Sequence, residues 1–158
     1  MKNLHSSVKQ MIGYNPASGF YVIIPDSWGH FIRGKRGLPD TNAMYMLARI
    51  IQWYIPSVEE NEDGTQGAYR NKFYGERFNW SNKQMAESFG WGIQSVRTAK
   101  GILSDLGLIK IDIDGSENNT QYIDIDPNRI KAITYFNVAD LESLPLLKTT
   151  LTSVTFNR

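Results

Sequence analysis

The sequence predicts an α+β fold on three observations. Residues 81–108 contain two amphipathic helical segments separated by a glycine turn. An alternating hairpin pattern follows directly at 108–126. A compact apolar run at 20–24 and a long apolar helical pattern at 41–54 come before them. Together they predict a winged helix-turn-helix with a three-helix core, a β-hairpin wing, an N-terminal strand and an extra C-terminal helix.

Residues 1–19 are expected to form an N-terminal arm that precedes the domain. Residues 1–19 are polar and interrupted by glycine and proline, so the domain is expected to span 20–133. The run FYVII at 20–24 is typical of a buried strand, which the following proline ends. Residues 26–30 can form one helical turn, and the RGKRG sequence at 33–37 predicts a flexible basic loop.

Residues 41–54 predict the central helix of the core. Asp40 or Thr41 can cap its start, and Pro56 prevents its continuation. Apolar residues cover a wide arc of this helix, as expected of an element packed on more than one side. The next residues, 57–67, are acidic and contain glycine, so they predict a mobile loop.

Aromatic and basic side chains are interleaved in residues 68–80, AYRNKFYGERFNW. Phe73, Phe78 and Trp80 indicate a short strand that leads into the next helix. Such a segment can be a nucleic-acid surface, since rings stack on bases and cations meet phosphates. The same aromatic residues can instead belong to the core, and the sequence leaves both interpretations open.

Residues 81–108 have the spacing of a helix-turn-helix. Ser81 or Asn82 can cap the first helix. Ala86 stands where two crossing helices leave room for a small side chain only. Gly90 stands in the turn, which requires a left-handed backbone that glycine adopts without steric cost.

The second of these helices is predicted to be a recognition helix. Its polar face can hydrogen-bond to base edges and phosphates, opposite a stripe of apolar residues. This face carries Gln94, Ser95, Arg97 and Thr98, with Lys100 at its edge, and Gln94, Arg97 and Thr98 are expected to read bases. The residues expected to hold phosphates are Lys83, Lys100, Arg33, Lys35 and Arg36.

A hairpin with an acidic outer face is predicted for 108–126. Pairing Lys110 with Asp124 keeps Asp124 away from Asp112, which avoids a like-charge pair. Five acidic residues and no basic one lie between Ile111 and Asp126. This face would be repelled by phosphate, so it either points away from DNA or docks a protein partner. Solvated aspartates are much commoner than metal ligands, so we predict no metal site here.

The C-terminal part is expected to add one short helix and a tail. Asp126 can cap that helix and Pro127 suits its first position. Residues 134–158 predict a tail that packs on the domain or serves as a linker. Its leucines could alternatively form a homodimer contact, which would suit a winged helix because one module rarely binds DNA tightly.

Composition limits the possible classes of function. The 158 residues are 41% hydrophobic, enough for one domain with a substantial core. A net charge of +1 means that any basic surface must be local. The chain has no cysteine and no apolar run long enough for a membrane, which fits a cytoplasmic protein.

No catalytic pattern is present in the sequence. His5 and His30 are the only histidines, and neither has partners at the spacing of a metal site or a triad. There is no glycine-rich phosphate loop and no nucleophile elbow. We therefore predict no enzymatic activity, no catalytic residue and no cofactor.

The order of these elements resembles the winged-helix domain of phage and plasmid replication initiators, or replisome organisers. The matching segments are FYVIIPDSW, LPDTNAMYMLARIIQWY, FNWSNKQMAESFGW and ILSDLGLIKI, within residues 20–126. The resemblance implies sequence-specific binding of double-stranded DNA at repeated origin sites. Two other interpretations stay open: a transcription regulator, and a protein-interaction module that uses the acidic wing.

Overall fold

The structure is a computed structural model that describes residues 22–116 and 118–135. The described residues form a mixed α+β fold, which confirms the predicted class. Their elements in chain order are η2 (Asp26–His30), α2 (Thr41–Tyr54), β1 (Ser57–Glu60), β2 (Gln66–Arg70), α3 (Asn82–Phe89), α4 (Ile93–Asp105), β3 (Ile109–Asp114), β4 (Thr120–Ile125) and α5 (Pro127–Thr134).

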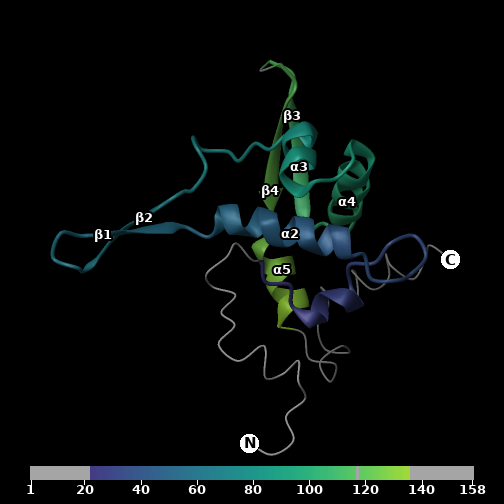
Figure 1. The fold of residues 1–158 in the computed structure, drawn as a ribbon, viewed down its shortest axis with the longest axis horizontal. Helices are drawn as coiled ribbons and strands as arrows, with labels where there is room; N and C mark the ends of the chain where they lie inside the picture. The colour runs from purple at the N-terminus through teal and green to yellow at the C-terminus, as the bar shows by residue number, and fades with distance from the viewer. Residues whose placement is uncertain (1–21, 117, 136–158) are drawn as a thin grey trace, which may run out of the picture.

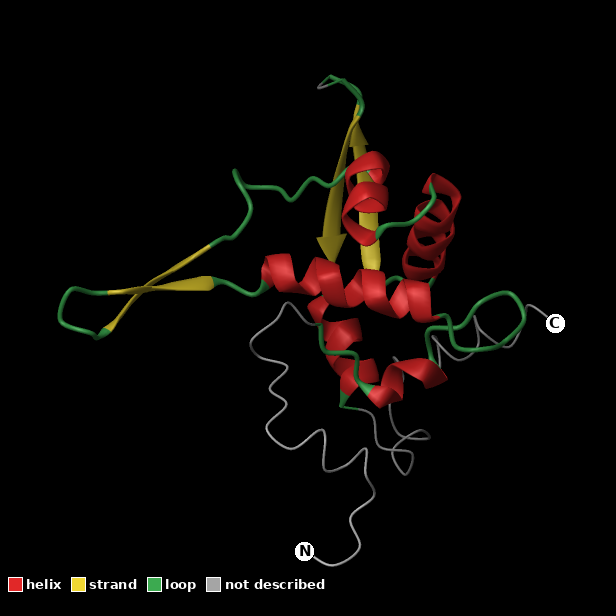
Figure 2. Cartoon of the chain, viewed as in Figure 1, coloured by secondary structure: helices red, strands yellow, loops and turns green. Residues whose placement is uncertain are grey.

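Helix α2 crosses the middle of the molecule (Figure 1). Helices α3 and α4 and the hairpin β3–β4 lie on one side of it, and α5 and η2 lie on the other. The hairpin β1–β2 projects outward from the C-terminal end of α2 (Figure 2). This arrangement confirms that α2 is the central helix.

The sequence of α2 explains its central position. Asp40 caps the helix by accepting a hydrogen bond from the Ala43 backbone at 2.8 Å, which decides between the two predicted caps. Met46, Leu47 and Ile50 are completely buried. Burying an aliphatic side chain of this size stabilises a fold by about 1.5–3 kcal/mol, so the contacts of α2 hold the core together.

Helices α3 and α4 are joined by a tight turn, as predicted. Ser81 and Gln84 form a capping box, with bonds of 3.1 and 3.0 Å between each side chain and the other residue's backbone N–H. Gly90 ends α3 with a φ of 69°, the left-handed conformation that the turn requires. Ala86 is buried where the helices meet. Gly92, in contrast, caps α4 with no side-chain hydrogen bond.

The hairpin β3–β4 has the predicted register, with Lys110 opposite Asp124. Ile109 and Ile123 are buried in the core. Ile113, in contrast, is 57% exposed. It is exposed because the distal end of the hairpin extends beyond the helices (Figure 1).

Residues 57–67 form most of the hairpin β1–β2, so the prediction of a loop was wrong. Turn chemistry explains the difference. The Asp63 carboxylate accepts hydrogen bonds from the backbone and hydroxyl of Thr65 at 2.9 and 2.6 Å. Gly64 supplies a φ of 79°, and the Asn61 backbone closes the turn on Thr65 at 2.9 Å. These contacts outweigh the acidic composition on which the prediction rested.

Two other predicted strands are not formed. Residues 22–24 belong to no strand and Ile23 is 73% exposed; Phe20 and Tyr21 lie outside the described residues. In residues 71–80 the strand is reduced to a single bridge between Asn79 and Tyr122. An apolar run forms a strand only where another strand pairs with its backbone. In the part of the chain that the structure describes, no segment pairs with residues 22–24.

The remaining local predictions have mixed outcomes. The helical turn at Asp26–His30 is present, and Asp126 caps α5 by accepting from the Arg129 backbone at 3.0 Å. The loop at 33–37 is closed by a bridge between Arg33 and Pro39. The arm at 1–19 and the tail beyond Tyr135 lie outside the described residues.

Candidate nucleic-acid interface

The outer face of α4 brings the three predicted base-reading residues together. Gln94, Arg97 and Thr98 are all exposed, and Ser95 beside them is half-buried. The opposite face of α4 is fixed in the core by fully or almost fully buried side chains, those of Val96, Ala99 and Leu103. The polar face is therefore held in a defined orientation while its side chains remain accessible.

Lys100 does not lie on this exposed face. It is 4% exposed, and its ammonium group donates to Asn82 Oδ1 at 2.6 Å and Gln121 Oε1 at 3.0 Å. A longer bond of 3.4 Å reaches the Trp80 carbonyl. Burial lowers the pKa of Lys100 to about 8. Lys100 therefore joins α4 to α3 and β4, and cannot hold a phosphate as predicted.

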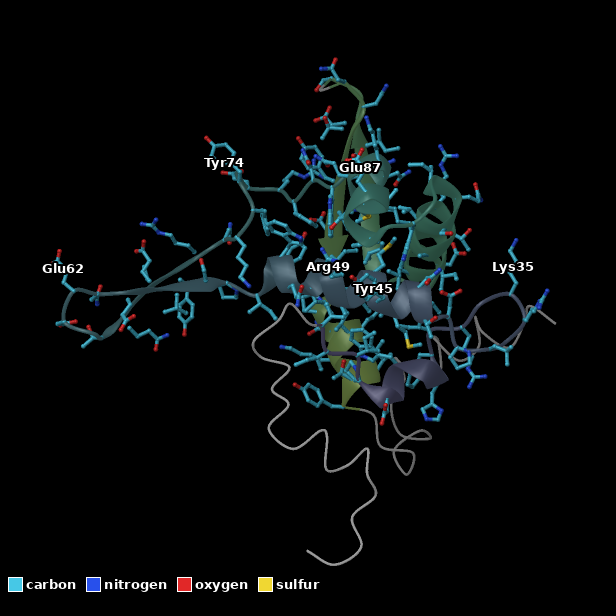
Figure 3. All side chains as sticks on the ribbon, viewed as in Figure 1. Lys35, Tyr45, Arg49, Glu62, Tyr74 and Glu87 are labelled. Atoms are coloured by element: carbon cyan, nitrogen blue, oxygen red, sulfur yellow. The ribbon has the colours of Figure 1, made fainter. Side chains whose placement is uncertain are left out.

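The basic loop at 33–37 divides into a structural residue and two accessible ones. The Arg33 guanidinium donates to the Gly29 carbonyl at 3.2 Å and to the Gly37 carbonyl at 2.7 Å, so it closes the loop on itself. Lys35 and Arg36 are exposed. Figure 3 shows Lys35 on the loop that extends from the N-terminal end of α2. Lys83, at the start of α3, is also exposed.

The acidic residues of β3–β4 have partners within the chain. Arg77 forms an ion pair with Asp112 at 2.7 Å, and its guanidinium lies 4.1 Å from the centre of the Tyr122 ring. Asp114 accepts from the backbone and hydroxyl of Ser116 at 2.9 and 2.6 Å. Of these contacts, the Arg77–Asp112 ion pair offsets one negative charge that a phosphate would meet on this hairpin, whereas the neutral donors of Ser116 leave Asp114 charged.

The sequence did not indicate the role of Arg77. A basic residue among aromatic ones was visible, but its position against the hairpin follows from the bridge between Asn79 and Tyr122. Such pairings between distant segments leave no local pattern. Asp124 also contributes to the surroundings of Tyr54, whose hydroxyl donates to the Ile123 carbonyl. Burial, reinforced by Asp124, raises the pKa of Tyr54 to about 12.

The aromatic residues of the segment before α3 are mostly core. Phe78 and Trp80 are buried, whereas Tyr74 is fully exposed. Arg49 of α2 lies 5.7 Å from the Trp80 ring and donates to Ser88 of α3 at 2.9 Å. Arg49 lies between α2 and α3 in Figure 3, so it orients the first helix of the pair.

No family model, curated protein or solved structure matches this chain. Geometry alone therefore supports the site. Within residues 22–116 and 118–135, no helix is both long and apolar enough to cross a membrane. In the same part of the chain, no three acidic or histidine side chains come together as potential metal ligands.

Proposed function

We propose that this chain is a winged helix-turn-helix protein that binds double-stranded DNA in a sequence-specific way. In this proposal α4 is the recognition helix and β3–β4 is the wing. The observation that carries the proposal is the exposed cluster of Gln94, Arg97 and Thr98 near the start of a rigidly held helix. Helix-turn-helix proteins read bases with the N-terminal residues of their second helix.

Each exposed residue of this cluster suits a defined contact. The Arg97 guanidinium can donate two hydrogen bonds to one guanine, and the Gln94 amide can pair in the same way with adenine. Thr98 can contact a thymine methyl group or a phosphate. Lys83, Lys35 and Arg36 are accessible and supply positive charge for the DNA backbone.

The proposed biological role rests on the resemblance of pattern to replication initiators. By that resemblance, the DNA target is a replication origin of a phage or plasmid. The lack of cysteine in the sequence supports the further proposal that the protein acts in the cytoplasm. Regulation of transcription would use the same interface. The genomic positions of the selected DNA motif would distinguish the two roles.

Selection from a random duplex library tests the proposal. The wild type should enrich one motif, and Arg97→Ala should lose about 1–3 kcal/mol of discrimination at one base. Arg70→Ala is the matched control, since Arg70 lies exposed on β2 and carries the same charge. This control should select the wild-type motif.

Binding measured across a series of salt concentrations separates the recognition of bases from electrostatic attraction to the DNA backbone. Lys35→Ala should leave the motif unchanged and make the logarithmic salt slope shallower by about 1, as expected for one lost phosphate contact. The absence of any motif, with equal weak binding by wild type and Arg97→Ala, would overturn the proposal. It would then favour a protein partner, to be tested by charge reversal at Asp124.

A further inference from the structure

A groove of about 740 Å³ lies between α2 and α5; α5 is on the side of α2 opposite α4 (Figure 1). Helix α5, the segment before η2 and the C-terminal end of α2 line it, with Trp28 at its buried end. Its rim carries apolar side chains that remain exposed. The exposed fractions are 73% for Ile23, 52% for Ile55 and 82% for Tyr135. Exposed apolar residues gathered at one hollow mark a binding surface.

The charge of the groove narrows the class of its occupant. Arg49, Lys72 and Lys131 line it, and none of its described lining residues is acidic. Lys72 is anchored at the rim, because its ammonium donates to the Gln52 carbonyl at 3.1 Å. A complementary segment therefore combines apolar side chains with negative charge.

Two segments of this chain are close in sequence to residues of the rim. Residues 1–21 precede the groove residue Ile23, and residues 136–158 follow the groove residue Tyr135. Residues 1–21 contain two lysines and no acidic residue, so the charge of the groove opposes them. The sequence FNVADLESLPLL at 136–147 contains four leucines, two acidic residues and no basic one.

We propose that residues 136–147 dock into this groove of the same chain. Leu141 is six residues from Tyr135, and an extended chain covers about 3.3–3.6 Å per residue, so the leucines can reach the groove. The tether holds the segment near the groove at an effective concentration in the millimolar range, which favours it over a free partner. Docking and DNA binding use different residues, because no residue of α4 is among those that line the groove.

Cysteine cross-linking in the full chain tests this proposal, since the natural sequence contains no cysteine. Ile55→Cys combined with Leu144→Cys places one thiol on the groove and one on the tail. The matched control combines Leu144→Cys with Ile113→Cys, a position of similar exposure (57%) on β3, outside the groove. Docking should make the first pair form an intramolecular disulfide at least about tenfold faster than the control pair.

Three results would overturn the proposal. Equal rates for both pairs would mean that the tail does not dock. A covalent dimer, with the groove thiol of one chain joined to the tail thiol of another, would mean that a second copy fills the groove. In chains that carry Ile55→Cys, faster disulfide formation with Met11→Cys than with Leu144→Cys would assign the groove to residues 1–21.

Charge reversal in the tail tests the electrostatic part of the proposal. Asp140→Lys combined with Glu142→Lys should slow disulfide formation between Ile55→Cys and Leu144→Cys, because the basic groove would then repel the tail. An unchanged rate would contradict the charge complementarity on which the choice of occupant rests. Circular dichroism checks that every variant is folded.

Discussion

The two hairpins differ in how they meet the rest of the protein. Hairpin β3–β4 packs one face against the helices, and Arg77 contacts its other face. In hairpin β1–β2 every residue except Gly67 is exposed, and the hairpin projects into solvent (Figure 2). Both are two-stranded and antiparallel. The comparison shows that local turn chemistry can form a hairpin without a core to support it.

Side-chain patterns explain the difference. Isoleucine alternates with polar residues in β3, so one face can be buried. Strand β1 reads SVEE, and its Val58 can only pair with Tyr69 across the hairpin, where both stay exposed. An isolated two-stranded hairpin is marginally stable in water. Hairpin β1–β2 should therefore add little to the stability of the domain.

The largest expected effect is on a buried residue of β4. Ile123→Ala should lower the free energy of unfolding by roughly 2–5 kcal/mol, because it removes buried methyl groups and leaves a cavity. Val58→Ala, the corresponding aliphatic truncation in β1, should change it by less than about 0.5 kcal/mol. Urea unfolding of both variants measures the difference. Similar losses would show that β1–β2 is part of the cooperative core.

Lys100, which bonds to Gln121 of β4, allows the contact between α4 and hairpin β3–β4 to be tested by changing the pH. Its pKa is about 8 in the folded chain against an ordinary 10.5. Between these values the unfolded chain binds more protons than the folded one, so stability should rise with pH. The measurement is the free energy of unfolding of wild type minus that of Lys100→Met from about pH 7.5 to about pH 10. This difference should increase with pH.

The ionisation of Tyr54 also makes stability depend on pH, and it has to be distinguished from the effect of Lys100. Its raised pKa of about 12 has the opposite consequence, because the unfolded tyrosine ionises first and stability falls above about pH 10. Both proteins contain Tyr54, so its contribution cancels in the difference. A difference that stays constant up to about pH 10 would contradict a buried ammonium whose charged form is disfavoured at position 100.

The parts of the fold that follow from local rules were predictable from the sequence. The capping box at Ser81, the glycine turn at Gly90 and the register of β3–β4 each depend on neighbouring residues or on one charge pattern. The apolar run at 20–24 was misleading, since a strand needs a paired neighbour and local composition does not reveal one. In β1–β2 the Asp63–Thr65 turn decided the structure.

The candidate site was predictable only in the part that depends on the periodicity of a single helix. Helical periodicity correctly placed Gln94, Arg97 and Thr98 on the exposed face of α4. Lys100 lies at the edge of that face, where a side chain can turn either way. Its direction is set by oxygens of Asn82 and Gln121, which come from other elements. Periodicity within one helix cannot contain that information.

The smallest expected effect compares one ion pair on each hairpin. Arg70 pairs with Glu59 at 2.8 Å across β1–β2, and both side chains are largely exposed. Arg77 pairs with Asp112 at 2.7 Å and also lies over the Tyr122 ring. Exposed pairs usually contribute about 0.2–1 kcal/mol, and a cation over a ring at an exposed site adds about 0.5–1 kcal/mol.

Double-mutant cycles with alanine at both pairs measure these contributions. The Arg77–Asp112 coupling should lie near the upper end of the range for exposed pairs, and Arg70–Glu59 near zero. Arg77→Ala should lose more stability than its ion pair accounts for, because it also loses the ring contact, and Tyr122→Leu should remove that excess. Equal couplings in both hairpins would show that packing against the core gives β3–β4 no electrostatic advantage. Raised salt should weaken both pairs, which provides an internal check that charge is being measured.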